Sequence, residues 1–125
     1  MSNSYRRVWL ITDTHFSHEK IKLYCNRPEN YEDVIIKRWN YLVKPLDEVI
    51  HLGDVIFNNA GRLKGILDHL NGTKILVRGN HDKNPNNWYT NHGFVFICDR
   101  LQKCGVLLSH RPTFPVPDDV SLNIF

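Results

Sequence analysis

Residues 8–15 read VWLITDTH, and four bulky apolar residues in this stretch lead directly into Asp13 and His15. A short apolar run of this kind is typical of a buried strand. The same arrangement, an apolar run and then polar side chains that can bind metal, recurs at residues 49–54, 75–82 and 106–112. Groups at the carboxyl ends of parallel strands lie together at one rim of a sheet, where α/β proteins bind ligands. The four stretches therefore predict one site assembled from four loops.

Helical patterns separate the first three of these strands. Apolar residues recur at near-helical spacing in residues 31–42 and 59–70, and a shorter helix is expected from Ser17 to about Cys25. Strands that alternate with helices predict βαβ units and a largely parallel sheet in the first eighty residues.

The last third of the chain has weaker patterns. Residues 84–91 are expected to form a loop or a short helix. Residues 94–98 and 105–108 are expected to be two strands that form an antiparallel pair, linked through residues 99–103.

The composition is that of one globular domain spanning residues 1–125, with 42% apolar and 23% charged residues. The net charge of +3 is not concentrated in one run, so it favours anionic substrates without identifying a nucleic-acid binder. The three cysteines form no CxxC motif, and an odd number cannot all pair in disulfides. This favours reduced thiols and a cytoplasmic protein. No apolar stretch approaches the ~20 residues of a membrane helix, and the N-terminus lacks the apolar core of a signal peptide.

The polar clusters have the chemistry of a site for two metal ions. Asp13 and His15 are two positions apart, so on an extended or turning backbone both side chains can face one ion. The two carboxylate oxygens of Asp54 can bridge two ions, and Asn80 and His110 add an amide oxygen and a second imidazole. Such mixed ligands suit Mn, Fe, Zn or Ni better than Ca, which prefers oxygen ligands alone.

This set of motifs resembles the calcineurin-like metallophosphoesterases, and in particular small bacterial and phage phosphoesterases with a TDTHFxH opening and an HLGDV second motif. The resemblance extends from about Val8 to Arg111. It implies an α/β fold in which a central β-sandwich is flanked by helices, in the layer order αββα. It also implies a hydrolase that cleaves phosphate esters with two divalent metal ions.

The resemblance also assigns roles to individual residues. It implies that Asp13 and His15 hold the first ion, that Asp54 bridges both ions, and that Asn80 and His110 hold the second. It further implies two catalytic residues. His81 would contact the scissile phosphate or protonate the leaving oxygen, and Asp82 would orient His81 and favour its protonated form.

Three further side chains flank the predicted site. His18 could face the phosphate or could simply lie at the surface where a helix begins. Arg78 and Arg111 could bind phosphate oxygens, and surface charge is the alternative for both. His51, inside the strand that precedes Asp54, is expected to be a core histidine or to support a metal ligand.

One motif of the resembled family is not found in these 125 residues. Family members carry a Gly-His-x-His after a later strand, and in this chain residues 122–124 resemble the strand that should lead into it. The sequence therefore predicts a domain shortened at its C-terminus, with three protein ligands per ion and a sheet edge that a second copy of the chain could cover. A truncated gene product, a frameshift that ends the chain early and a form completed by another chain are alternative explanations.

Three functions compete at this point. The five ligands and His81 favour a metallophosphoesterase in which a metal-activated water cleaves a phosphodiester, a nucleotide or a phosphomonoester. The missing motif favours a catalytically impaired remnant that binds metal, phosphate or a partner. The net charge is the only argument for a nucleic-acid-binding module, and no basic helix supports it, so nucleic acid is expected only as a substrate.

Overall fold

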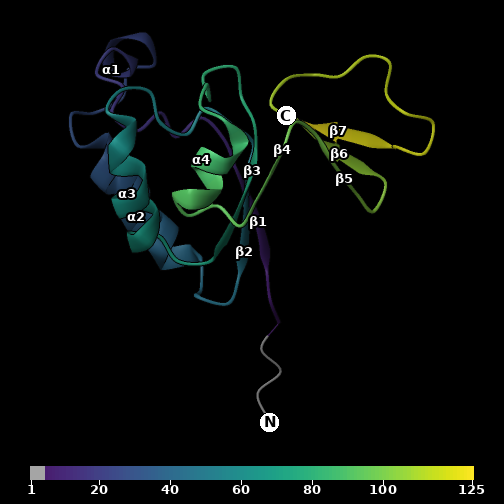
Figure 1. Cartoon of the computed structure of the whole chain (residues 1–125), viewed down its shortest axis with the longest axis horizontal. Helices are drawn as coiled ribbons and strands as arrows, with labels where there is room; N and C mark the ends of the chain where they lie inside the picture. Colours follow the sequence, from purple (N-terminus) through teal and green to yellow (C-terminus); the bar gives the residue numbers. More distant parts are fainter. Residues whose placement is uncertain (1–4) are drawn as a thin grey trace.

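The computed structural model describes residues 5–125, which form two β-sheets and a layer of helices (Figure 1). The first sheet has four parallel strands in the order β1-β2-β3-β4, and these are Val8–Ile11, Glu48–His51, Thr73–Val77 and Phe96–Cys98. The second sheet has three short strands, β5 (Leu101–Lys103), β6 (Val106–Leu108) and β7 (Leu122–Ile124). Strand β6 is antiparallel to β5 and parallel to β7.

The helices lie in the connections of the parallel sheet. Between β1 and β2 the chain forms α1 (Ile21–Tyr24) and α2 (Tyr31–Leu42). The 3₁₀ helix η1 (Ala60–Arg62) and α3 (Leu63–His69) connect β2 to β3, and α4 (Asn86–Asn91) connects β3 to β4. Within residues 5–125, none of these helices has the length and the apolar character that a membrane crossing requires.

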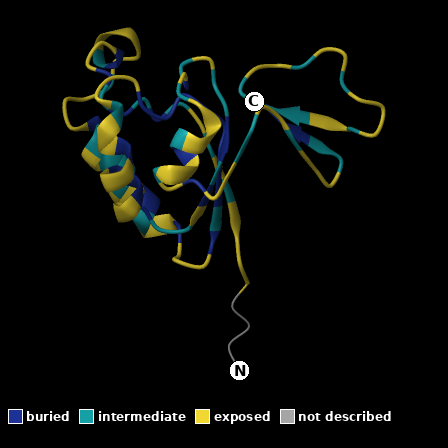
Figure 2. Cartoon of the chain, in the orientation of Figure 1, coloured by how far each residue is buried: buried dark blue, intermediate teal, exposed yellow. Residues whose placement is uncertain are grey.

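The four-stranded sheet is covered on both faces, which explains why its central strands are continuous apolar runs. Successive side chains of a strand point to opposite faces. Val49 and Leu76 therefore pack against the helices, whereas Ile50 and Val77 pack against Leu108 of the second sheet. Figure 2 shows the buried residues along the inner strands and on the inward sides of the helices.

The predicted α/β class is confirmed, with a parallel sheet and helices in its connections. In Figure 1, α2, α3 and α4 lie on one side of the four-stranded sheet and the second sheet lies on the other. Residues 5–125 form no helix on the outer face of the second sheet, so their layers are helix, sheet and sheet.

The individual elements follow the sequence pattern, with shifted ends. Strand β1 coincides with the four apolar residues at 8–11, and β2 and β3 begin one and two residues before the stretches at 49–54 and 75–82 that pointed to them. The predicted helix at residues 59–70 is divided into η1 and α3, and α1 is shorter than the predicted residues 17–25.

The predicted antiparallel pairing of residues 94–98 with residues 105–108 is wrong. Strand β4 extends the parallel sheet beside β3, and β6 takes its antiparallel partner, β5, from the stretch expected to be a linker. Cys104 and Gly105 both have positive φ, at 52° and 76°, as a two-residue hairpin turn of type I′ requires. The Cys-Gly pair lacks the usual Asn-Gly signal, and this explains why the pattern did not reveal the hairpin.

Candidate metal centre

The loops that follow β1 and β2 run side by side, and this places the first ligand-type residues together. The backbone N–H of Asp13 donates to the Gly53 carbonyl at 3.0 Å, and that of His15 donates to the Asp54 carbonyl at 3.1 Å. Parallel pairing thus continues beyond the ends of the two strands. As a result, Asp13 and His15 lie opposite Asp54 at the rim of the sheet.

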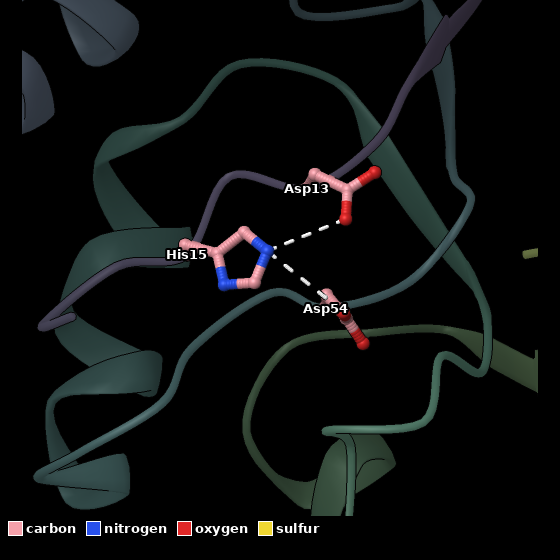
Figure 3. Close-up of side chains that lie close together, drawn as sticks. All are labelled: Asp13, His15 and Asp54. Carbon is pink, nitrogen blue, oxygen red and sulfur yellow. Dashed lines mark hydrogen bonds and ion pairs between the residues drawn. The ribbon is translucent and has the colours of Figure 1, made fainter. Parts of the chain in front are cut away.

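Asp13, His15 and Asp54 form the first group of ligand-type atoms. One ligand atom from each residue lies within 4.8 Å of the others. The Nε2 atom of His15 is 3.3 Å from Asp13 Oδ1 and 3.8 Å from Asp54 Oδ2, and the three side chains point toward one another (Figure 3). This geometry brings together two carboxylates and an imidazole, which is a donor set that suits a divalent transition metal.

His110 and Asn80 extend the group on the other side of Asp54. The Nε2 atom of His110 is 3.0 Å from Asn80 Oδ1 and 3.3 Å from Asp54 Oδ2. The Nδ1 atom of His110 is 2.8 Å from the Leu52 carbonyl, which can only accept a hydrogen bond. In the neutral ring Nδ1 therefore carries the proton, and Nε2 presents its lone pair to the two oxygens. Three electron-pair donors that converge in this way fit a cation between them.

The five predicted metal-binding residues thus lie together, and we refer to them below as the ligand cluster: Asp13, His15, Asp54, Asn80 and His110. Asp54 belongs to both halves of this cluster.

The backbone of the ligand cluster adopts sparsely populated conformations. Asp13, His15 and Asp54 have φ values of 56°, 49° and 59°, in the left-handed region that costs non-glycine residues about 1–3 kcal/mol each. Gly79 packs so closely on Asp54 that a β-carbon at position 79 would overlap the carboxylate. The surrounding hydrogen bonds therefore hold an arrangement that the local sequence would not adopt alone.

Asp82 holds two of the loops together. Its carboxylate accepts hydrogen bonds from the backbone N–H groups of Asp54 at 2.8 Å, Val55 at 3.1 Å and Gly79 at 2.7 Å. The side chain is only 2% exposed, and burial raises its pKa although the three donors oppose that shift. The expected contact with His81 is not formed, because the carboxylate is bonded to backbone groups instead.

His81 is positioned by its own backbone. Its N–H donates to Asp54 Oδ1 at 2.9 Å, while its ring Nδ1 is buried and has no hydrogen-bond partner among residues 5–125. The ring lies 6.1 Å from the ring of His15, measured between centroids. The ring of His81 therefore lies next to the ligand cluster, while its backbone N–H binds one of the two carboxylate oxygens of Asp54.

The three residues predicted to bind substrate have different surroundings. His18 is buried, and its ring centroid lies 5.4 Å from that of His15. Burial lowers the pKa of His18, and the nearby His15 and His81 lower it further. His18, His15 and His81 line the same cavity, so the alternative of a surface position for His18 is wrong.

Arg78 and Arg111 line a second cavity, of about 410 Å³, together with Asn80 and His110. The guanidinium of Arg78 donates to Asn86 Oδ1 at 2.7 Å and to the Asp82 carbonyl, so it supports the loop that carries Asp82. Arg111 is exposed and is the more available of the two for a phosphate oxygen.

His51 is a buried supporting residue, as the sequence predicts. Its Nδ1 accepts a hydrogen bond from Gly53 N–H at 3.0 Å, so its Nε2–H donates to Thr14 Oγ1 at 3.0 Å. Thr14 in turn donates to the Val55 carbonyl at 2.8 Å. Burial lowers the pKa of His51 to about 3, and the neutral ring connects the first two loops.

Sequence reasoning missed two residues that hold the first loop. Arg27 donates to the carbonyls of Asp13 at 2.7 Å and Thr14 at 2.8 Å. The Tyr31 hydroxyl donates to the His15 carbonyl at 2.6 Å and accepts from His18 N–H at 3.2 Å. Both residues lie outside the strand ends, so no periodic pattern identifies them.

A third missed residue, Asn123 on β7, holds the loop of His110. Its Nδ2 donates to Ser109 Oγ at 3.0 Å and to the Leu107 carbonyl at 2.9 Å, and its Oδ1 accepts from Thr113 N–H at 2.9 Å. The polar position in the middle of an otherwise apolar strand, residues 122–124, was the available signal.

Comparison with known proteins is consistent with this geometry. Residues 6–120 match the calcineurin-like phosphoesterase family. An uncharacterized protein of Methanocaldococcus jannaschii is 45% identical over 86 residues, which cover 64% of this chain and 49% of the relative. The crystal structure of a protein of unknown function from Aquifex aeolicus has a TM-score of 0.72 and 35% identity, and the match covers 91% of this chain and 66% of that one. The chain thus spans about half the length of the first protein and two thirds of the second.

Proposed function

The chain belongs to the calcineurin-like phosphoesterase family, and we propose that it hydrolyses phosphate esters at a centre of two divalent metal ions. The family implies metal-dependent hydrolysis of phosphate esters in general. The observation that carries the proposal is the convergence of the Asp13 carboxylate, two imidazoles and an amide oxygen around the Asp54 carboxylate. The substrate would be a phosphodiester, a nucleotide or a phosphomonoester.

In this proposal, Asp13 and His15 would hold one ion, Asn80 and His110 the other, and Asp54 both. The ions would be Mn, Fe, Zn or Ni, which accept mixed oxygen and nitrogen ligands. When bound, divalent ions offset the negative charge of phosphate oxygens and lower the pKa of the attacking water.

The chain's own residues would supply the remaining chemistry. The ring of His81 lies beside the ligand cluster, 6.1 Å from the ring of His15 between centroids, so it would contact the phosphate or give a proton to the leaving oxygen. Asp82 would act indirectly, because its hydrogen bonds to Asp54 and Gly79 N–H fix the loops that carry the ligands.

Turnover of bis(p-nitrophenyl) phosphate tests the proposal. Protein stripped of metal with a chelator should be inactive, and Mn²⁺, Ni²⁺ or Zn²⁺ should restore turnover. Asp54→Ala should abolish that turnover, because it removes the carboxylate shared by both halves of the cluster. Asp118→Ala is the matched control, since Asp118 is an exposed carboxylate in another loop. No metal-dependent turnover, or an Asp54→Ala variant equal to the parent, would contradict the proposal.

A catalytically impaired protein that binds metal or phosphate is the alternative. The described residues provide each half of the cluster with three protein ligands when Asp54 is counted twice, and this favours a weaker site than a fully ligated one. Calorimetric titration with Mn²⁺ separates the two functions: binding without turnover supports the alternative, and turnover rejects it.

We further propose that a second copy of the chain covers the free edge of the second sheet. Leu122 and Phe125, on and after the edge strand β7, are 52% and 58% exposed. Sedimentation of the purified protein should show a dimer, and a monomer at all concentrations would contradict this. The cytoplasmic location predicted from the cysteines stays a prediction.

A further inference from the structure

A cavity of about 660 Å³ opens directly beside the ligand cluster. His15 and His81 form its inner wall, and His18, Tyr24 and Phe57 continue that wall outward. The volume is within the ~300–1,000 Å³ range of small-molecule sites. The cavity is therefore large enough for a part of the substrate beyond the phosphate.

Aromatic rings form one part of the wall of this cavity. The ring of His18 lies 4.1 Å from that of Phe57, edge to face, and 6.4 Å from that of Tyr24. Phe57 in turn lies 5.5 Å from His81. Because His15 belongs to the ligand cluster and His81 lies next to it, the series of rings begins at the cluster and ends at the exposed rings of Tyr24 and Phe57.

The two outer rings are exposed, and core packing does not account for them. Phe57 is 44% exposed and Tyr24 is 71% exposed, and neither belongs to the two apolar cores among the described residues. The backbone at Phe57 is nevertheless fixed, because its N–H donates to the Phe16 carbonyl at 2.9 Å. An apolar ring on a fixed backbone at the mouth of a cavity is arranged for contact with a ligand.

Polar side chains line the same cavity beside the rings, namely Glu19, Lys20 and Asn58. A ligand that combines a flat apolar face with polar edges would contact both the rings and these polar groups.

We propose that this cavity binds the nucleobase of a nucleotide substrate, stacked against Phe57 and Tyr24, while the phosphate occupies the ligand cluster. This inference rests on the proposed function and adds the substrate class to it. Stacking on aromatic side chains accepts any base, since every base has a flat π-face. The shared ligand chemistry is a nucleoside monophosphate unit, present both in free nucleotides and in a nucleic-acid strand.

Calorimetric binding of AMP and of ribose 5-phosphate to the Mn²⁺-loaded protein tests this inference, with phosphate release followed in the same samples. The two probes share the phosphate and the sugar, so their difference reports the base. We expect AMP to bind at least about tenfold more tightly. Equal affinities, or no binding of either probe, would overturn the inference.

Ring variants make the test specific. Phe57→Leu and Tyr24→Leu should each reduce the preference for AMP, whereas Phe57→Tyr, which keeps the ring, should retain it. Tyr41→Leu is the matched control, because Tyr41 is an 80% exposed ring on α2 that does not line the cavity. A preference that persists unchanged in both leucine variants would overturn the inference.

The outcomes separate this inference from the proposed function. Turnover of bis(p-nitrophenyl) phosphate with equal affinity for AMP and ribose 5-phosphate would leave the phosphoesterase standing and reject the base site. A preference for AMP without turnover of bis(p-nitrophenyl) phosphate would reject the phosphoesterase and leave the base site standing. Binding of tetradeoxyadenylate tests whether the natural ligand is a free nucleotide or a nucleic-acid strand. Tighter binding than AMP with steep salt dependence indicates a strand, and equal or weaker binding indicates a free nucleotide.

Discussion

Asp82 shows how one buried carboxylate can hold two loops of a site through backbone hydrogen bonds. Its two oxygens accept three backbone N–H groups, one from Gly79 and two from the loop of Asp54. Removing such an acceptor leaves buried donors without a partner, which costs about 1–3 kcal/mol per group. At the scale of the residue, we therefore expect Asp82 to affect the stability of the fold directly, and to affect catalysis only because it holds the loops of the site.

The substitution Asp82→Asn tests this role. The amide keeps one acceptor oxygen but directs an NH₂ group at a backbone donor, so we expect the free energy of unfolding to fall by about 2 kcal/mol. Urea unfolding of the metal-free protein measures it, with Asp118→Asn as the exposed control. Unchanged stability together with lost turnover would support direct orientation of His81 instead.

His51 should make stability depend on pH. Burial lowers its pKa to about 3 from 6.5, so between these values the unfolded chain binds a proton that the folded chain does not. The contribution of neutral His51 to the free energy of unfolding is complete above pH 6.5. It is lost as the pH falls from 6.5 towards 3, at up to ~1.4 kcal/mol per pH unit.

Urea unfolding at pH 7.5, 6 and 5 measures this effect in metal-free protein. We expect the parent to lose more stability on acidification than His51→Gln, whose amide cannot take up the proton. Asp82 is present in both proteins, so its titration cancels. The exposed His69 provides the control variant His69→Gln, which should behave like the parent. If the free energy of unfolding changes equally with pH in the parent and in His51→Gln, His51 is not buried in the neutral form.

At the scale of the element, some elements carry the ligand-type residues and others hold the loops in which these residues lie. The ends of β1, β2 and β3 carry ligand-type residues, whereas the start of α2 contributes Tyr31, which holds the loop after β1 from outside. The short strand β7 acts in the same way on the loop after β6 through Asn123. Elements that carry no ligand therefore determine where the ligands point.

We predict that Asn123→Ala weakens metal binding more than it weakens the fold. The variant removes the hydrogen bonds that hold Ser109 and Thr113 on either side of His110. Outer contacts of this kind typically contribute about 10–100-fold to metal affinity, and we expect about tenfold for this variant. Calorimetric titration with Mn²⁺ measures the change, and Asn87→Ala, on the exposed side of α4, is the control. A parent-like affinity would show that the loop is held by other contacts.

At the scale of the whole molecule, the α/β class and the meeting of the four loops could be predicted from the sequence. Both depend on short-range signals, namely apolar runs that end in polar residues and helical spacing between them. The same signals failed for the second sheet, where β5 and β6 are three residues long and their turn is Cys104-Gly105. Short strands contain too few residues for alternation to be distinguished from chance.

The composition of the ligand cluster follows from the order of residues along the chain, because its members come shortly after four strands, Asp13 and His15 both after β1. The residues that hold this cluster, and the groups that surround it, became apparent only from the folded molecule. The partners of Asp82, His51 and Asn123, and the aromatic wall from Tyr24 to Phe57, join segments that are distant in the chain. Such contacts depend on how the loops fold back over the sheet, and no local pattern of residues encodes that path.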